Sequence, residues 1–218
     1  MNLYYFLGWL LTGVYSVLWH RIRYYRKAKL PRKTGFLIVC NHQSLADPNL
    51  VAFGLYRGVA FMARSSLFKG FLGWWLPRVW CLPVERGSSD RASIRRTVDM
   101  LKSGRPLILF PEGTRSRDGK LQGFKRGLEL IARQAGVPIL PTAIHGVGAA
   151  FPKGASFPKP SKVRITYGEL VSLEQLKEIG TEGVRERVQA LMTEMDERFG
   201  SADLVSPSPD PDSSGQKD

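Results

Sequence analysis

From residue 35 to about residue 150, short apolar runs alternate with longer segments whose apolar positions recur at helical spacing. The short runs predict buried strands, and the longer segments predict helices. Strands and helices in alternation predict a single α/β domain, with a mostly parallel central sheet flanked by helices. The expected strands cover residues 35–40, 59–63, 79–84, 106–110 and 137–144, and the expected helices cover residues 47–56, 67–76, 91–102 and 126–135.

The C-terminal part of the chain continues this pattern less regularly. Alternating polar and apolar positions at residues 162–167 predict a half-exposed strand, and residues 173–179 and 184–199 predict two late helices. Two helix starts carry recognisable signals. Asp47, which precedes a proline, and Asp90 are each expected to cap the helix that follows.

The first segment of the chain is apolar and aromatic, and a basic run follows it. Residues 2–19 are 18 residues without a charged side chain. A helix of this length extends about 27 Å, slightly less than the hydrocarbon core of a bilayer. Seven Lys and Arg residues follow between residues 21 and 33, and no acidic residue precedes Asp47. This combination is typical of a helix that associates with an anionic membrane.

Three interpretations of the first segment compete. A cleaved signal peptide carries its positive charges before the apolar stretch and a small-residue cleavage site after it, whereas this chain has the reverse order. A buried core helix is the second interpretation. We favour the third, a membrane-embedded or interfacial helix, which either spans the bilayer or lies in its plane. The basic flank then lies on the cytoplasmic face, which is that of the inner membrane in a bacterium.

These features divide the chain into three parts. Residues 1–34 are expected to form a membrane-anchoring helix with a basic arm. Residues 35–200 are expected to form the α/β domain. Residues 201–218 are expected to be a disordered tail, because the chain is rich in Pro, Ser and Asp from residue 206 onward.

The composition adds information about the partner. The 218 residues include 32 Lys and Arg against 19 Asp and Glu, which gives a net charge of +13. So basic a balance predicts an anionic partner, which is a nucleic acid, a membrane surface or a phosphorylated substrate. The two cysteines, Cys40 and Cys81, exclude a disulfide-dense scaffold and offer no zinc-type ligand cluster. Unpaired thiols also agree with a cytoplasmic location.

The polar segment after the first strand, residues 41–47, contains His42 and, five residues later, Asp47. In α/β sheets, loops at the carboxyl ends of strands build the functional site. If this loop curls back, the Asp47 carboxylate holds one imidazole nitrogen and stabilises the imidazolium that forms when the other nitrogen takes a proton. Such a pair is a general base for a hydroxyl group. The alternative is that His42 satisfies a loop hydrogen bond and that Asp47 only caps a helix.

A second polar loop, residues 111–123, follows the fourth strand and combines glycines with two guanidinium groups. Gly113 and Gly119 allow backbone amides to approach a ligand, and Arg115 is suited to binding a phosphate through two hydrogen bonds. Arg86, at the end of the third strand, is a candidate second cation. The alternatives are a solvated turn with a structural ion pair and, for Arg86, an ordinary surface arginine.

Other catalytic patterns are absent or incomplete. The chain has no Gly-x-Ser-x-Gly sequence and no Walker A loop, which argues against an ordinary serine esterase and a P-loop nucleotide site. Residues 146–151 imitate a dinucleotide fingerprint but have Phe151 where the third glycine belongs, so they indicate a turn after a strand. Cys40 lies inside an apolar run, which favours a buried thiol over a catalytic one.

Together these segments resemble the motifs of the glycerolipid acyltransferase superfamily, specifically the 1-acyl-sn-glycerol-3-phosphate (lysophosphatidic acid) acyltransferases. Residues 41–48 resemble the first motif of this family, His-x4-Asp, and residues 84–86 resemble its second block. Residues 110–116 match the third block at every position, and residues 137–141 resemble the fourth. The resemblance covers about residues 35–170, and four blocks in order are far more specific than any one of them.

The resemblance implies transfer of a fatty acyl group from acyl-CoA or acyl carrier protein to the 2-hydroxyl of 1-acyl-glycerol-3-phosphate, which gives phosphatidic acid. It implies His42 as the base and Asp47 as the residue that orients it. It implies no metal and no bound cofactor. The implied partners are membrane lipid, the lysophospholipid acceptor and the acyl donor, without nucleic acid. The other implied site residues are Arg86, Glu112, Gly113, Thr114 and Arg115 around the acceptor phosphate, and Pro141 at the acyl end.

These residues differ in their expected roles. Arg115, and less directly Arg86, holds the phosphate, whereas Glu112 and Thr114 shape the loop. Backbone amides near Gly113 are expected to stabilise the oxyanion of the tetrahedral intermediate.

One position departs from the family pattern. Trp80 stands where a small glycine is usual, six residues before the arginine of the second block. This departure leaves open the shape of the acyl pocket and the identity of the lysophospholipid. Two other functions therefore stay in competition. One is an acyltransferase for another lysolipid, such as a lyso-ornithine lipid, and the other is a non-enzymatic, membrane-tethered binder of anionic lipid or nucleic acid.

Overall fold

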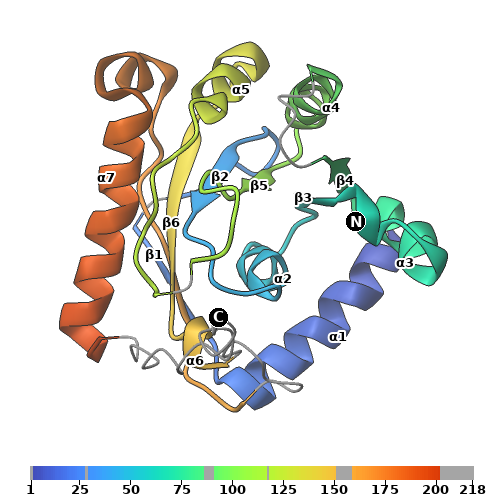
Figure 1. The fold of residues 1–218 in the computed structure, drawn as a ribbon, viewed down its shortest axis with the longest axis vertical. Helices are drawn as coiled ribbons and strands as arrows, with labels where there is room; N and C mark the ends of the chain where they lie inside the picture. The colour runs from blue at the N-terminus through green and yellow to red at the C-terminus, as the bar shows by residue number, and fades with distance from the viewer. Residues whose placement is uncertain (1, 28, 86–90, 117, 151–158, 202–218) are drawn as a thin grey trace, which may run out of the picture.

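The short apolar runs form the inner strands of a sheet in the computed structural model, which describes residues 2–27, 29–85, 91–116, 118–150 and 159–201. Over these residues the sheet has seven strands in the order β1-β7-β6-β2-β5-β3-β4 (Figure 1). Neighbouring strands are parallel except for β6 and β7, so the mostly parallel sheet is confirmed. The strands are β1 (Arg23–Arg26), β2 (Leu37–Cys40), β3 (Ala60–Arg64), β4 (Cys81–Val84), β5 (Leu107–Leu109), β6 (Ile139–His145) and β7 (Arg164–Tyr167).

Helices occupy most of the connections between these strands, as the sequence predicts. They are α1 (Leu3–His20), α2 (Asp47–Phe53), α3 (Gly70–Trp75), α4 (Arg91–Lys102), α5 (Gly127–Ala135), α6 (Val147–Ala150) and α7 (Leu173–Phe199), with the 3-10 turns η1 (Ser65–Leu67) and η2 (Leu76–Val79) on either side of α3. The single helix predicted over residues 67–76 is therefore wrong in its bounds. Pro77 lacks the N–H group that would continue the α-helical ladder, and α3 ends just before it.

Two more predictions differ in detail from the structure. The two late helices are joined in α7, and non-helical backbone at Gly180 (φ 60°, ψ −166°) separates them. The turn expected at residues 146–151 instead contains the short helix α6. The predictions that Asp90 caps α4 and that the tail is disordered concern residues 86–90 and 202–218, which lie outside the described part of the chain.

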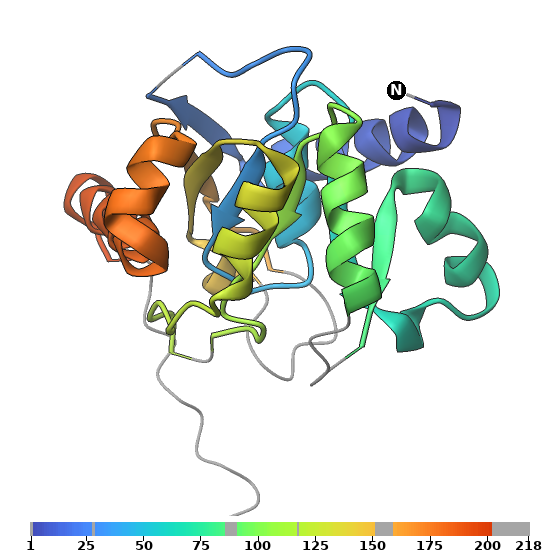
Figure 2. The same ribbon diagram turned by 90° about the horizontal axis from the view of Figure 1, so that it is seen from above.

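The inner strands are apolar on both faces because helices cover both faces of the sheet. Along β2, Leu37 and Val39 pack with α4, α5 and α7, whereas Ile38 and Cys40 pack with α2. Figure 2 shows α4, α5 and α7 on one side of the sheet, and α1 and α2 on the other. Parallel sheets are normally buried in this way, which explains why the strands appear in the sequence as continuous apolar runs.

The strand at one edge of the sheet, β1, was missed by sequence analysis. It lies within the expected basic arm and pairs in parallel with β7, with Arg23 opposite Arg164. Tyr24 stacks on Tyr167, with ring centroids 6.2 Å apart, and its hydroxyl donates to the carbonyl of Leu50 at 2.8 Å. A strand of four residues with an arginine at each end carries too little alternation to be identified from its sequence.

Burial of β7 also differs from the expected half-exposed pattern. Ile165, Thr166 and Tyr167 are all buried. β7 lies between β1 and β6, and the C-terminal part of α7 packs on the adjacent residue Ala143 of β6. Both faces of the strand are therefore covered, although its sequence alternates.

The apolar N-terminal segment forms one helix, α1, from Leu3 to His20. Its Asn2 side chain accepts the backbone N–H of Tyr5, and its last residue, His20, is 1 % exposed. α1 contacts α2 and η2, so one face of it is attached to the domain. No helix in the described ranges is both long enough and apolar enough to cross a membrane.

Candidate active site

The two loops that the sequence singles out meet at one edge of the sheet. β2 and β5 are parallel neighbours, so the loops that follow them start at the same edge. The backbone N–H of Ser116 donates to the carbonyl of His42 at 2.7 Å, and the backbone N–H of His42 donates to Glu112 Oε1 at 2.7 Å. The second loop therefore holds the backbone of His42 on both sides.

The imidazole of His42 and the carboxylate of Asp47 form a hydrogen-bonded pair. Nδ1 of His42 lies 2.8 Å from Oδ2 of Asp47. The carboxylate is fully buried, whereas the imidazole is 18 % exposed. An ionised carboxylate only accepts hydrogen bonds, so it places the proton on Nδ1 and leaves a lone pair on Nε2. The more exposed partner of the pair is thus the one equipped to take a proton.

Hydrogen bonds from the loop hold the Asp47 carboxylate, which does not cap the helix. α2 begins at Asp47 itself, and Ala46 occupies the N-cap position without a side-chain hydrogen bond, so the predicted cap is wrong. Oδ2 of Asp47 accepts the backbone N–H groups of Gln43 at 2.7 Å and of Ser44 at 2.8 Å, in addition to Nδ1 of His42. The loop curls around this one oxygen, which fixes the direction of the carboxylate.

Sequence analysis missed two contacts that hold His42 in place. The ring of Phe110 stacks on the imidazole, with centroids 4.0 Å apart and planes 22° apart. The buried side chain of Asn41 bonds to the backbone of Ile144 in both directions, donating at 2.9 Å and accepting at 2.8 Å. Both residues lie within the segments that resemble the family motifs, but only the neighbouring strand β6 explains what Asn41 does.

Glu112 lies under the second loop, and both of its carboxylate oxygens are used. Oε1 accepts the His42 N–H, and Oε2 accepts the backbone N–H of Gln122 at 3.0 Å. Burial raises the pKa of the Glu112 carboxyl above its ordinary value, although these two amides oppose the shift. A carboxylate with both oxygens occupied by backbone amides is suited to shaping the loop, one of the roles expected for it.

The turn above Glu112 exposes the residues expected to meet an anion. Gly113 has φ +74°, and its N–H donates to the carbonyl of Phe110 at 3.1 Å, which closes the turn. Thr114 and Arg115 are exposed. Within the described part of the chain, Arg115 has no carboxylate partner, so its guanidinium is not taken up by the ion pair considered as an alternative.

A cation that sequence analysis did not assign to the site lies over this turn. A Cβ added to Gly113 would be 2.7 Å from Nζ of Lys125, so the ammonium group rests against the glycine. The backbone N–H of Lys125 donates to the carbonyl of Pro111 at 3.0 Å. Lys125 lies within the stretch of residues 35–170 that resembles the family but outside its four motif segments, so no specific signal in the sequence pointed to it.

The other predicted site residues are placed differently. Arg86 lies outside the described residues. Pro141 is buried within β6, paired with Val39, and its expected contact with the acyl chain stays a prediction. Burial raises the pKa of the Cys40 thiol well above its ordinary value and that of Cys81 to about 12, so neither thiol is suited to be a nucleophile.

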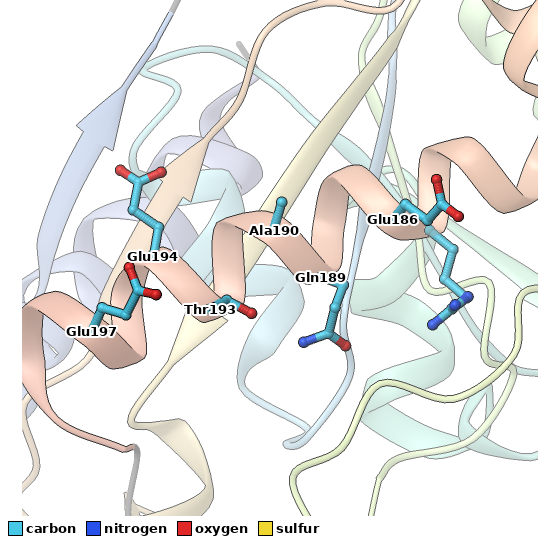
Figure 3. A pocket seen from close by; sticks show the side chains of 7 residues that line it. Glu186, Gln189, Ala190, Thr193, Glu194 and Glu197 are labelled. Carbon is cyan, nitrogen blue, oxygen red and sulfur yellow. The ribbon is translucent and has the colours of Figure 1, made fainter.

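A shallow groove on the outer face of α7 contains none of the expected site residues (Figure 3). Its lining comes from one helix and carries three glutamates, Glu186, Glu194 and Glu197. All of its lining residues belong to α7, so this groove is not part of the site around His42.

The fold and the paired side chains define a class of protein: an α/β protein with a hydrogen-bonded His–Asp pair at the carboxyl edge of a mostly parallel sheet. A family model described as Acyltransferase matches residues 21–145, which is more than half of the chain. The chain therefore belongs to the Acyltransferase family.

Individual relatives agree with this assignment. The chain is 30% identical over 188 residues to the 1-acyl-sn-glycerol-3-phosphate acyltransferase of Bacillus subtilis, covering 81% of this chain and 90% of that protein. It is 28% identical over 196 residues to the protein of the same name from Streptococcus pneumoniae, and the match covers 87% of this chain and 71% of that protein.

A solved structure is also similar. The crystal structure of the 1-acyl-sn-glycerophosphate (LPA) acyltransferase PlsC from Thermotoga maritima superposes with a TM-score of 0.70. The two chains are 28% identical, and the match covers 89% of this chain and 79% of that one. Both the expected family and the expected α/β fold with its N-terminal helix are confirmed.

Proposed function

We propose that the protein is a 1-acylglycerol-3-phosphate O-acyltransferase, which transfers a fatty acyl group from a thioester to the 2-hydroxyl of 1-acyl-glycerol-3-phosphate. The observation that carries the proposal is the 2.8 Å hydrogen bond from His42 Nδ1 to the buried Asp47 carboxylate. It leaves Nε2 as a base beside a loop that presents the exposed guanidinium of Arg115, which has no carboxylate partner among the residues that the structure describes. The relatives named above support the same reaction.

The reaction follows from the lone pair on Nε2 of His42. Nε2 takes the proton of the acceptor hydroxyl while the hydroxyl oxygen attacks the carbonyl carbon of the thioester. The resulting imidazolium is stabilised by the Asp47 carboxylate, with which it shares the Nδ1 hydrogen bond. The tetrahedral intermediate collapses by breaking its carbon–sulfur bond, and the thiolate receives the proton from the imidazolium. A positioned base of this kind contributes about 10²–10⁴-fold to the rate.

The oxyanion and the phosphate need separate partners. The N–H of Gly113 is used in its own turn, so we assign the oxyanion to the following amides, of Thr114 and Arg115. The guanidinium of Arg115 binds the acceptor phosphate, and the sequence adds Arg86 as a second cation. Glu112 and Thr114 shape the loop, and Pro141 contributes to the acyl end. The donor is acyl-CoA or acyl carrier protein, and neither a metal nor a nucleic acid is part of the proposal.

The proposed substrates place the enzyme at a membrane. The acceptor and the product are lipids, and the basic run that follows α1 complements an anionic leaflet. We therefore propose association with the cytoplasmic face of a membrane, with α1 as the anchoring element. In a bacterium this is the inner membrane.

The test is an acyl transfer assay with purified protein, labelled acyl-CoA and a panel of acceptors that includes lysophosphatidic acid, lyso-ornithine lipid and neutral lysolipids. We expect transfer to the 2-hydroxyl of lysophosphatidic acid and loss of thiol release in His42→Ala, with an unchanged circular dichroism spectrum. Unchanged turnover in His42→Ala would reject the mechanism. Transfer to a different acceptor alone would reject the substrate.

The role of Arg115 has its own test. A charge-assisted hydrogen bond contributes about 1.5–3 kcal/mol, so Arg115→Ala is expected to raise KM for lysophosphatidic acid about tenfold or more. The effect on a neutral lysolipid is expected to be much smaller. Arg185→Ala, on the outer face of α7, is the matched control and is expected to change neither value. Equal effects on charged and neutral acceptors would show that Arg115 does not bind the phosphate.

A further inference from the structure

The short helix α3 exposes large apolar side chains that the proposed chemistry does not use. Phe71 is 70 % exposed, and Leu72 and Trp74 are each 44 % exposed. None of the six residues of α3 is buried. A contiguous apolar patch that is exposed to water is unfavourable, and such patches mark sites of interaction.

The exposed surface of α3 is continuous with that of α1. The Tyr4 ring meets Trp74 edge to face, with centroids 5.6 Å apart, and meets Trp75 at 6.1 Å. A Cβ added to Gly8 would lie 3.3 Å from the indole of Trp75, so the two helices are in close contact there. The N-terminal half of α1 and α3 therefore present one surface.

α1 is attached to the domain along its length by one face. Its buried residues are Tyr5, Gly13, Ser16 and His20. A Cβ added to Gly13 would lie 1.8 Å from the ring of Phe53, which shows how closely α1 approaches α2. The opposite face is apolar and exposed, and it includes Leu3 (67 %), Leu11 (70 %), Val14 (50 %), Val17 (50 %) and Leu18 (76 %).

The charges around this surface match an anionic partner. Lys69 precedes α3 and is exposed, and the guanidinium of Arg78 lies over the ring of Trp74 at 4.2 Å. At the other end of α1, the basic run begins at Arg21. α7, whose outer groove is lined by Glu186, Glu194 and Glu197 as well as Arg185, lies on the side of the molecule away from α3 (Figure 1). An anionic leaflet is thus attracted to one side and repelled by the other.

We propose that α3 is a second lipid-inserting element, which enters the headgroup region of an anionic leaflet together with α1, and that α1 lies in the membrane plane. The proposal rests on the proposed function and deepens it by defining how the enzyme meets its lipid substrate. β3 runs parallel to β5, so it ends at the same edge of the sheet as the loop containing Arg115. η1 directly follows β3, so the segment that carries α3 starts at the edge where His42 lies, and its insertion holds that edge close to the leaflet.

The test measures binding of the full chain to vesicles of phosphatidylcholine with phosphatidylglycerol. Phe71→Ser and Leu72→Ser remove exposed side chains, so the fold is expected to be unchanged by circular dichroism. Withdrawing one immersed side chain of this size is expected to lower the partition coefficient about tenfold. The matched control is Leu130→Ser on α5, whose side chain is 45 % exposed and lies outside the surface. It is expected to bind as the wild type does.

Binding by both α3 variants at the wild-type level would overturn the proposal. Loss of a dimer in these variants, measured by sedimentation, together with unchanged vesicle binding would assign the surface to a second copy of the chain instead. Activity on water-soluble, short-chain acceptor and donor separates this proposal from the proposed function. The α3 variants are expected to keep this activity, and its absence in the wild-type protein would reject the proposed function without affecting the vesicle result.

Discussion

Asp47→Asn tests the charge of the buried carboxylate without removing its geometry. One oxygen, Oδ2, accepts all three hydrogen bonds, from Nδ1 of His42 and from the N–H groups of Gln43 and Ser44. The single oxygen of an asparagine can take this position and accept the same donors. The substitution therefore removes the negative charge that stabilises the imidazolium, while the orientation of the imidazole is retained.

The magnitude follows from the burial and separation of the pair. Asp47 is fully buried and His42 is 18 % exposed, so the attraction is poorly screened. Opposite charges about 4 Å apart attract by about 4 kcal/mol at an effective dielectric constant of about 20. A loss of that size in the transition state corresponds to a decrease in kcat of about 10³-fold. Oδ1 of Asp47 has no hydrogen-bond partner among the described residues, so the new NH2 group is buried unpaired and lowers stability by about 1–3 kcal/mol.

The assay is thiol release from acyl-CoA with lysophosphatidic acid, and urea unfolding measures the free energy of unfolding. Asp99→Asn, an exposed residue of α4, is the control and is expected to leave kcat unchanged. The decisive readout is a double-mutant cycle. If Asp47 acts through His42, Asp47→Asn has no further effect on kcat in the His42→Ala background. An equal loss in both backgrounds, or no loss in the single variant, would refute the reasoning.

Three further predictions concern the scaffold of the site. Glu112→Gln presents an NH2 group to the backbone N–H of Gln122 and is expected to lower kcat. Because burial raises the pKa of Glu112 in the folded protein, the stability of the wild type relative to this variant is expected to be largest at acidic pH and to fall as pH rises through that pKa. Urea unfolding at several pH values measures this difference. Gly113→Ala is expected to lower the free energy of unfolding by about 1–2 kcal/mol, because φ is +74° and the new Cβ displaces the Lys125 ammonium, measured by thermal and urea unfolding. Asn41→Ala leaves the N–H and carbonyl groups of Ile144 unpaired and is expected to cost about 1–3 kcal/mol for each group, with a lower kcat, measured by unfolding and thiol release. The first prediction is contradicted if the stability of the wild type relative to Glu112→Gln rises with pH. The second and third are contradicted if Gly113→Ala or Asn41→Ala, respectively, is as stable as the wild type.

The interior of the fold was predictable because it depends on local patterns. Every short apolar run predicted as a strand overlaps one in the structure, since a strand covered on both faces must be apolar at successive positions. β1 was not predictable, because the pairing of Arg23–Arg26 with β7 joins segments more than a hundred residues apart. The burial of Thr166 was not predictable for the same reason, since α7 covers it only in the folded chain.

The site shows the same division between local and long-range information. The spacing of His42 and Asp47 anticipates their hydrogen bond, since only a short loop separates them along the chain. The stacking of Phe110 on the imidazole and the ammonium of Lys125 over Gly113 depend on contacts between separate segments. Sequence could name the motif residues but could not say that the Gly113 amide is already used in its own turn.

The amino-acid sequence by itself determined the α/β class, the apolar N-terminal helix, the excess of positive charge and the two polar loops, because each depends on residues that are near one another along the chain. Only the tertiary structure decided that the loops share one sheet edge, that one face of α1 is attached to the domain, and that α3 continues its apolar surface. These depend on strand order and helix packing, which bring distant segments together through many weak contacts that no local pattern records.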